Sequence, residues 1–161
     1  MSWNINSVRL RAPIVVDVLN AVQPDVLCLQ ETKCPDEAFP FKAFHQAGYE
    51  HIAINGMKSY NGLAIISKYP IETHVIHHRV AKEDCRHLEA IVNGIEIHNL
   101  YIPAGGDEPD PSINEKYKHK LDFVDEMTDW FTQKRSKKSD IVILGDFNIA
   151  PMKMTFGAVS N

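Results

Sequence analysis

Polar side chains that could take part in catalysis follow three segments of this sequence that are predicted to be strands. Asn4 and Asn6 lie near the start, Glu31 follows an apolar run at 26–29, and Asp146 and Asn148 follow another at 141–144. Two carboxylates are the number that Mg²⁺ often takes from a protein when phosphate and water complete its octahedron. Asparagine amides can bind phosphate oxygens or hold a water molecule without repelling a phosphodiester. The set therefore predicts metal-assisted phosphoryl chemistry.

Each of these residues has a simpler interpretation when it is taken alone. Asp and Asn after a strand are ordinary turn residues, and Asp146 with Asn148 would by themselves favour a turn. Ligands of α/β sheets, however, gather outside the carboxyl ends of the strands. We therefore expect the three strand ends to share one site. Tyr101 ends a further predicted strand before a loop with Gly105 and Gly106, where it could bind phosphate or be only a sheet-edge tyrosine.

The apolar patterns predict alternating helices and strands in a single domain. Apolar residues recur at helical spacing over 12–22 and stop before Pro24, while Asn93-Gly94 is a strong hairpin signal. A long amphipathic helix is expected after Ser112, with Leu121 on its apolar side. The remaining predictions are a short helix around 41–44 and strands at 26–29, 49–54, 63–66, 90–92, 95–98 and 141–144. The expected fold class is α/β with a partly antiparallel sheet.

Composition excludes several classes of protein. The chain has 161 residues, 44% of them hydrophobic, and a formal charge of −4, which argues against coating nucleic acid through bulk positive charge. The sequence contains neither a membrane-spanning run nor a secretory h-region, so a cytoplasmic location is expected. The three cysteines are predicted to be reduced thiols and the eight histidines structural or solvated. Asp84, Arg86 and Glu89 are expected to be solvated or paired surface charges.

Five motifs together resemble the exodeoxyribonuclease III and apurinic/apyrimidinic (AP) endonuclease branch of the endonuclease/exonuclease/phosphatase superfamily. These motifs are WNINSVRLR at 3–11, LQETK at 29–33, YNGLA at 60–64, NLYIP at 99–103 and GDFNIAP at 145–151. The resemblance implies a four-layer α/β sandwich of two mixed sheets flanked by helices. It further implies a DNA repair hydrolase that cleaves phosphodiester bonds using Mg²⁺ or Mn²⁺. The expected substrate is double-stranded DNA with abasic sites or 3′ ends, with no membrane or protein partner.

The same resemblance implies a role for each site residue. Glu31 corresponds to the principal metal ligand, and Asn4 lies close to the metal and phosphate. Asp146 corresponds to the aspartate that takes a proton from the attacking water or gives one to the leaving oxygen. Asn148 is expected to bind the scissile phosphate and orient Asp146, and Tyr101 to contact the phosphate. The implied catalytic residues are thus Tyr101, Asp146 and Asn148, and the residues around the metal are Asn4, Glu31, Asp146 and Asn148.

The chain departs from the family pattern after its last motif. Family members continue through further strands, another metal-site aspartate and a terminal Ser-Asp-His motif, whereas this sequence has no Asp-His dipeptide. Residues 1–161 are therefore expected to form one incomplete domain that lacks its C-terminal part. We expect weakened catalysis and an exposed apolar face on the first sheet. The alternatives are a non-catalytic remnant or half-protein with weak metal or DNA binding, and a phosphoinositide or sphingomyelin phosphodiesterase.

Overall fold

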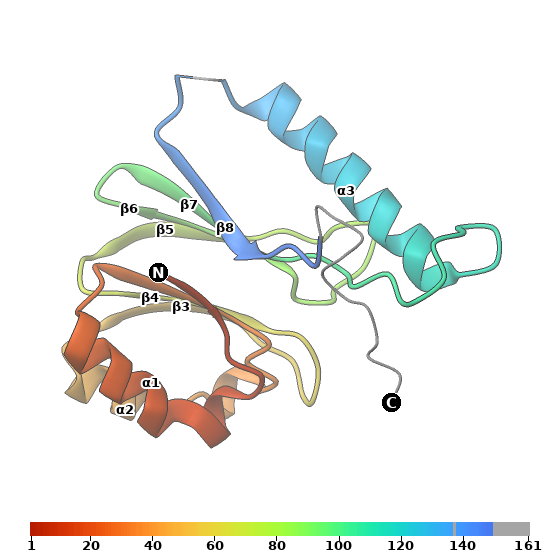
Figure 1. Ribbon diagram of the computed structural model, residues 1–161. Helices are drawn as coiled ribbons and strands as arrows, with labels where there is room; N and C mark the ends of the chain where they lie inside the picture. Colours follow the sequence, from red (N-terminus) through yellow and green to blue (C-terminus); the bar gives the residue numbers. More distant parts are fainter. Residues whose placement is uncertain (137, 150–161) are drawn as a thin grey trace.

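Strands and helices alternate along the chain in the computed structural model, which describes residues 1–136 and 138–149 (Figure 1). Its elements are β1 (Ser2–Asn4), α1 (Val8–Val22), β2 (Val26–Gln30), the 3₁₀ turn η1 (Asp36–Ala38), α2 (Phe41–Gln46), β3 (His51–Asn55), β4 (Leu63–Ser67), β5 (Ile71–Ile76), β6 (His87–Val92), β7 (Ile95–Tyr101), α3 (Glu115–Lys134) and β8 (Ile141–Asp146). No helix in these described ranges is long and apolar enough to cross a membrane.

The strands form two four-stranded mixed sheets. Sheet A has the order β1-β2-β4-β3 and sheet B the order β5-β6-β7-β8. In each sheet one edge pair is parallel, β1 with β2 and β7 with β8, and the other pairs are antiparallel. Figure 1 shows the sheets stacked face to face, with α1 and α2 outside sheet A and α3 outside sheet B. The predicted four-layer α/β sandwich is confirmed.

Alternation along the strands supplies both apolar layers. Leu27 and Leu29 of β2 pack toward α1 and α2, in a cluster that includes Val15 and Phe44. Cys28, between them, faces the other way into a cluster between the sheets. The other members of that second cluster are Ala53, Leu63, Ile65, Leu88, Ala90, Val92 and Ile97. Because successive side chains of a strand point to opposite faces, one apolar run can serve two layers.

The expectation that the first sheet would expose its inner face is wrong. Strands β5–β8 lie within this chain and cover that face, so Cys28 and Ile65 have no exposure to solvent. Incomplete burial is instead found at β8, whose strand partner among the described residues is β7 alone. Val142 is 44% exposed and Ile143 42% exposed on this edge strand. Apolar edge strands promote association, so the predicted tendency to aggregate now rests on β8.

The buried side-chain amide of Asn99 joins the two sheets. Asn99 of β7 has no exposure to solvent, and its Nδ2 donates to the carbonyl oxygens of Leu29 and Ala64, both at 3.0 Å. Its Oδ1 accepts a 2.7 Å hydrogen bond from Nε2 of Gln30, the last residue of β2. Buried polar groups are costly unless they are hydrogen-bonded, so this network favours one alignment of the sheets.

Replacing Asn99 with leucine should destabilise the protein strongly. The substitution keeps the volume similar but removes the acceptor of the 2.7 Å Gln30 hydrogen bond and both hydrogen bonds donated by Asn99, a loss we estimate at about 2–4 kcal/mol of unfolding free energy. Urea unfolding would measure this change. Asn20→Leu on the exposed face of α1 is the matched control and should change stability by less than about 0.5 kcal/mol. A loss below about 1 kcal/mol for Asn99→Leu would contradict the importance of the network.

Several boundaries and faces differ from the sequence predictions. Helix α1 begins at Val8, four residues before the predicted start. In α3, Phe123 is fully buried whereas Leu121 is 37% exposed, so the prediction that Leu121 lies on the apolar side of this helix is wrong. Strand β5 was not predicted, because its residues are mostly exposed and it depends on pairing with β6. The short strand β1 forms because Ser2–Asn4 pairs in parallel with β2.

Candidate active site

Four of the predicted site residues come together where strands of both sheets end. Asn4 ends β1 and Glu31 directly follows β2 in sheet A. Tyr101 ends β7 and Asp146 ends β8 in sheet B. Both edge pairs are parallel, so each delivers two neighbouring strand ends to the same side of its sheet. Stacking of the sheets places all four side chains in one cluster.

Asn4 connects the two carboxylates of this cluster. Its Nδ2 donates to Glu31 Oε1 at 2.7 Å and to Asp146 Oδ2 at 2.8 Å. Its Oδ1 accepts from the backbone N–H of Asn6 at 3.2 Å, which fixes the side chain from the other end. One neutral amide therefore holds two acidic groups from different sheets within reach of a common ligand.

Glu31 also bonds to Tyr101 and Lys33. The Tyr101 hydroxyl donates to Glu31 Oε1 at 2.8 Å, and Lys33 Nζ lies 2.8 Å from Glu31 Oε2. Burial by itself would raise the pKa of Glu31, but the hydrogen bonds from Asn4, Lys33 and Tyr101 together lower it below its ordinary value. Burial, with the Glu31 carboxylate, raises the pKa of Tyr101 to about 12. Glu31 is thus held as a carboxylate and Tyr101 as a neutral hydroxyl donor.

The backbone around Glu31 adopts conformations that most residues avoid. Glu31 has φ 54° and Lys33 φ 49°, and the facing Ser7 has φ 89°. The Ser7 N–H donates to the Glu31 carbonyl at 2.7 Å, and the Thr32 N–H donates to the Gly62 carbonyl at 3.1 Å. Such residues cost free energy and persist where the surroundings impose them. The backbone of Asn61 and Gly62, just before β4, therefore supports the loop that carries Glu31.

The turn after β8 has a different set of partners. The Asn148 N–H donates to Asp146 Oδ1 at 3.0 Å, while Asn148 Nδ2 donates to the Ile102 carbonyl at 2.8 Å. Lys120 of α3 donates to the Asn148 carbonyl at 2.5 Å. Asn148 thus contacts the cluster through Asp146, and its side-chain amide bonds to the end of β7. An open cavity of about 860 Å³, lined in part by Asp146, Asn148 and Lys120, lies beside this turn.

The donor set of the cluster fits a hard divalent cation. Glu31 and Asp146 supply carboxylate oxygens, the ligands that Mg²⁺ and Mn²⁺ favour. Asn4 presents its amide nitrogen to both carboxylates, so it would have to turn its oxygen toward an ion in order to ligate one. Lys33 neutralises one Glu31 oxygen on the opposite side from Asn4 and Tyr101. The residues present can therefore hold such an ion with a modest rearrangement.

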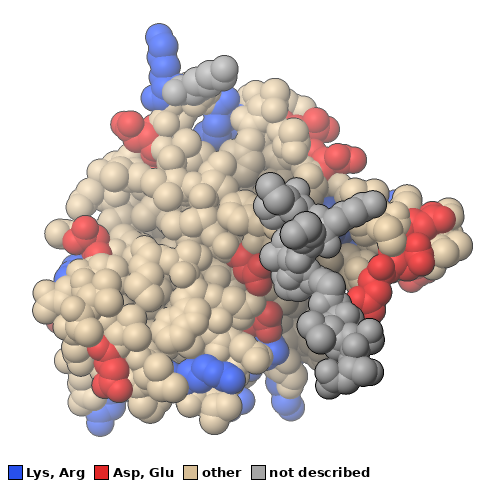
Figure 2. Space-filling model, in the orientation of Figure 1, with Lys and Arg blue, Asp and Glu red and all other residues tan. Residues whose placement is uncertain are grey.

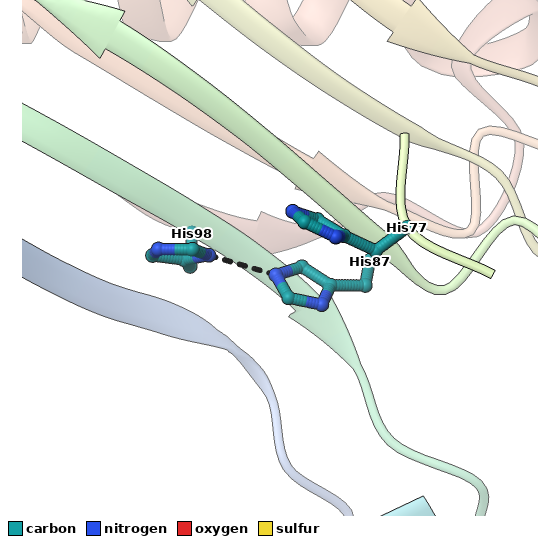
Figure 3. Close-up of side chains that lie close together, drawn as sticks. All are labelled: His77, His87 and His98. Atoms are coloured by element: carbon teal, nitrogen blue, oxygen red, sulfur yellow. Dashed lines mark hydrogen bonds between the residues drawn. The ribbon is translucent and has the colours of Figure 1, made fainter. Parts of the chain in front are cut away.

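A second cluster, of three histidines, lies on the outer face of sheet B. Figure 3 shows His77, His87 and His98 close together, with the hydrogen bond between His87 and His98 marked. Their candidate ligand atoms lie within 4.8 Å of one another. Trp130 of α3 stands edge-on to all three histidine rings. The guanidinium of Arg79 stacks on the Trp130 ring. Sequence spacing gave no indication of this cluster, because strand pairing creates it.

Hydrogen-bond directions make the histidine cluster a closed network. Arg79 donates to His87 Nδ1 at 3.0 and 3.1 Å, so the His87 proton is assigned to Nε2, which lies 2.7 Å from His98 Nδ1. His98 in turn donates from Nε2 to Glu96, and His77 Nε2 is 2.7 Å from Glu89. A metal at His87 Nε2 would move its proton to Nδ1, against the Arg79 donors. The arrangement thus favours neutral imidazoles over metal ligation.

Mild acid should therefore destabilise the fold. Burial, the largest cause, lowers the pKa values of all three histidines below about 6.5, the usual value in an unfolded chain. Below that pH the unfolded state binds more protons, so the unfolding free energy falls by at most about 1.4 kcal/mol per histidine per pH unit. Above it these groups contribute no pH dependence. Urea unfolding at pH 7.5 and 5.5 measures the difference.

The variants for this experiment separate the cluster from other titrating groups. His98→Gln should reduce the loss of stability between pH 7.5 and 5.5, because one buried imidazole is removed. His74→Gln, at an exposed position of β5, should leave the loss unchanged. Equal unfolding free energies at the two pH values would show that the three imidazoles do not remain neutral in the folded state.

The charged residues expected on the surface are more buried than predicted. Glu89 pairs with His77, which agrees with one of the two alternatives, but it is only 7% exposed, so its predicted location on the surface is wrong. Asp84 and Arg86 form the expected pair, with Asp84 Oδ2 and Arg86 Nε 2.7 Å apart. That pair adjoins the site, because Arg86 stacks on the ring of Tyr101 at 4.7 Å. No sequence motif indicated these contacts.

The fold and the site together define a two-sheet α/β sandwich with paired carboxylates at the carboxyl ends of its strands. A model of the endonuclease/exonuclease/phosphatase family matches residues 1–159. The chain belongs to this family.

Relatives within the family include DNA repair nucleases. The chain is 29% identical to exodeoxyribonuclease III of Haemophilus influenzae, over 98% of this chain and 60% of that protein. An AP endonuclease from Archaeoglobus fulgidus superposes with a TM-score of 0.84 and 34% identity, over 94% of this chain and 58% of the other. A 3′ phosphatase from Neisseria, solved with a product DNA hairpin, superposes with a TM-score of 0.80 and 32% identity, over 94% of this chain and 58% of the other. The chain thus spans about three fifths of these relatives.

Proposed function

We propose that this chain carries a divalent-metal-dependent site that hydrolyses DNA phosphodiester bonds. The observation that carries the proposal is the Asn4 amide, which joins Glu31 of one sheet to Asp146 of the other. Tyr101 completes the cluster with a neutral hydroxyl on Glu31. The names of the relatives support DNA as the substrate class. Residues 1–161 would form a single domain corresponding to the N-terminal part of those relatives.

Each residue would have a distinct role in this reaction. Glu31 and Asn4, together with Asp146 and Asn148, would hold Mg²⁺ or Mn²⁺, which when bound supplies a Lewis acid for the phosphate. Asp146 would take the proton of the attacking water, or give one to the leaving oxygen. The Asn148 N–H already orients Asp146 Oδ1, and its side chain would turn to the scissile phosphate. Tyr101 would donate its hydroxyl proton in a hydrogen bond to a phosphate oxygen.

The expected substrate is duplex DNA with an abasic site or a 3′ end. Water would attack the phosphorus in line on the 5′ side of an abasic nucleotide, or at the terminal phosphodiester. On the face in Figure 2, Lys and Arg side chains are scattered and form no continuous basic surface. Because the chain has a formal charge of −4, binding would depend on local contacts to phosphate, and DNA affinity should fall as the salt concentration rises.

Cleavage of a duplex with one abasic site tests the proposal. The reaction is run with the chain in excess over DNA, with Mg²⁺, with Mn²⁺ and with chelator, beside the Glu31→Gln and Asp146→Asn variants. Metal-dependent cleavage that both substitutions abolish would support the assignment. Cleavage that survives both substitutions would show that the activity does not depend on Glu31 and Asp146, and it would overturn the assignment of the site.

Two other outcomes would overturn the proposal. Metal and DNA binding without cleavage, measured by calorimetry and a salt titration, would favour the non-catalytic binding module. Faster hydrolysis of a phosphoinositide or sphingomyelin than of abasic DNA would favour a lipid phosphodiesterase.

A further inference from the structure

Arg86 is fixed against Tyr101 by contacts to both the backbone and the ring of Tyr101. It lies directly before β6, opposite Tyr101 of β7, and its carbonyl accepts the Tyr101 N–H at 2.9 Å. Its Nη1 donates to the Tyr101 carbonyl at 3.1 Å, and its guanidinium stacks on the Tyr101 ring at 4.7 Å. The Arg86 side chain is only 16% exposed. A planar, multiply bonded guanidinium of this kind is not replaceable by a flexible ammonium group.

Asp84 holds Arg86 in this position. Asp84 Oδ2 accepts from Arg86 Nε at 2.7 Å and lies 3.4 Å from His119 Nε2 of α3. The Asp84 carbonyl accepts a 2.7 Å hydrogen bond from the Asn61 amide. Asn61 also supports the Glu31 loop, because its own carbonyl accepts the Lys33 N–H at 2.9 Å. The same hydrogen-bonded chain thus runs from Tyr101 to Lys33, two residues after Glu31.

We propose that Arg86, held by Asp84, is the positioning residue for Tyr101. Arg86 fixes the Tyr101 ring so that the hydroxyl lies at Glu31. A substrate phosphate would have to accept the Tyr101 hydrogen bond at this place. The positive charge of Arg86 over the ring also favours hydrogen-bond donation by the hydroxyl. This role rests on the proposed phosphodiesterase function, and the side-chain contacts of Arg86 are with Asp84 and Tyr101 rather than with Glu31 or Asp146.

A double-mutant cycle on DNA cleavage tests the coupling. Arg86→Met should lower the cleavage rate about tenfold, in keeping with the loss of a stacked charge and a hydrogen bond. In a Tyr101→Phe background the same change should cost less than about twofold, because no hydroxyl remains to be positioned. Arg86→Lys should cleave DNA faster than Arg86→Met but more slowly than the parent. Arg79→Met removes another stacked arginine remote from the site, so its effect should be equal in both backgrounds.

A measurement without DNA or metal separates this inference from the proposed function. The protein is labelled with 3-fluorotyrosine, and the Tyr101 ¹⁹F signal is assigned by its absence in Tyr101→Phe. In Arg86→Met this signal should move toward that of Tyr60, which is 69% exposed, whereas in Arg79→Met it should not move. An unchanged Tyr101 signal, or equal rate losses in both backgrounds, would overturn the role of Arg86. Absence of all cleavage would reject the proposed function, and the ¹⁹F result would still decide where Tyr101 is held.

Discussion

Gly145→Ala should disrupt the pairing of β7 with β8 and move Asp146 away from Asn4. Gly145 has φ +144°, and a Cβ added there would lie 1.9 Å from the carbonyl oxygen of Leu100, its partner in the register. Backbone atoms on neighbouring strands cannot yield as a flexible side chain can. We expect a loss of about 3 kcal/mol or more of unfolding free energy, together with loss of the Asn4–Asp146 bond. Thermal or urea unfolding would measure the loss.

Gly94→Ala provides the matched control for this substitution. Gly94 also has a positive φ, +72°, but a Cβ there would have no neighbour within 4 Å. Its replacement should therefore show only the backbone strain, about 1 kcal/mol. If Gly145→Ala were no more destabilising than Gly94→Ala, the close approach to Leu100 would not determine how β8 is held.

Glu31→Gln should have the largest effect on DNA cleavage, lowering the rate at least about a hundredfold. Glutamine can still accept from Asn4 and Tyr101, but it removes one of the two carboxylates and places an amide near Lys33. A lower cleavage rate in Glu31→Gln therefore reflects the missing negative charge rather than a change in side-chain shape. Rates are measured across a Mg²⁺ titration, and a partial recovery at high Mg²⁺ would identify weakened metal affinity as the cause.

A second glutamate serves as the control for charge. Glu50→Gln changes the net charge equally at an exposed position, and it should leave the cleavage rate within about twofold of the parent. A comparable loss in both variants would point to a general electrostatic effect. Retained activity in Glu31→Gln would remove Glu31 from the metal site.

Local sequence patterns predicted much of the scaffold. The buried runs at 26–29 and 63–66 became β2 and β4, and Asn93-Gly94 joins β6 to β7 as expected from its turn chemistry. The polar side chains at the strand ends also came together at Asn4, Glu31, Tyr101 and Asp146, as expected for neighbouring parallel strand ends, whereas the Asn6 and Asn148 side chains bond elsewhere. Strand β5 was missed since its exposed alternating residues bury little apolar surface of their own.

Contacts that depend on strand register could not be read from spacing. His87 and His98 meet because β6 and β7 pair antiparallel, with His98 opposite Glu89. The same pairing places Arg86 against Tyr101. A sequence shows that a histidine or an arginine is present, but one residue of register decides whether it faces solvent, helix or site.

The hydrogen bond between Asn4 and Asp146 joins positions that are 142 residues apart in the chain. Contacts of such long sequence separation form slowly, because the loop-closure entropy is lost before the contact provides any stabilisation. During synthesis on a ribosome, α1 and the strands of sheet A emerge long before β8. The newly made chain would therefore carry Asn4 and Glu31 without their partner carboxylate until β8 is released, and the candidate site would form only after all of sheet A and the other strands of sheet B have been made.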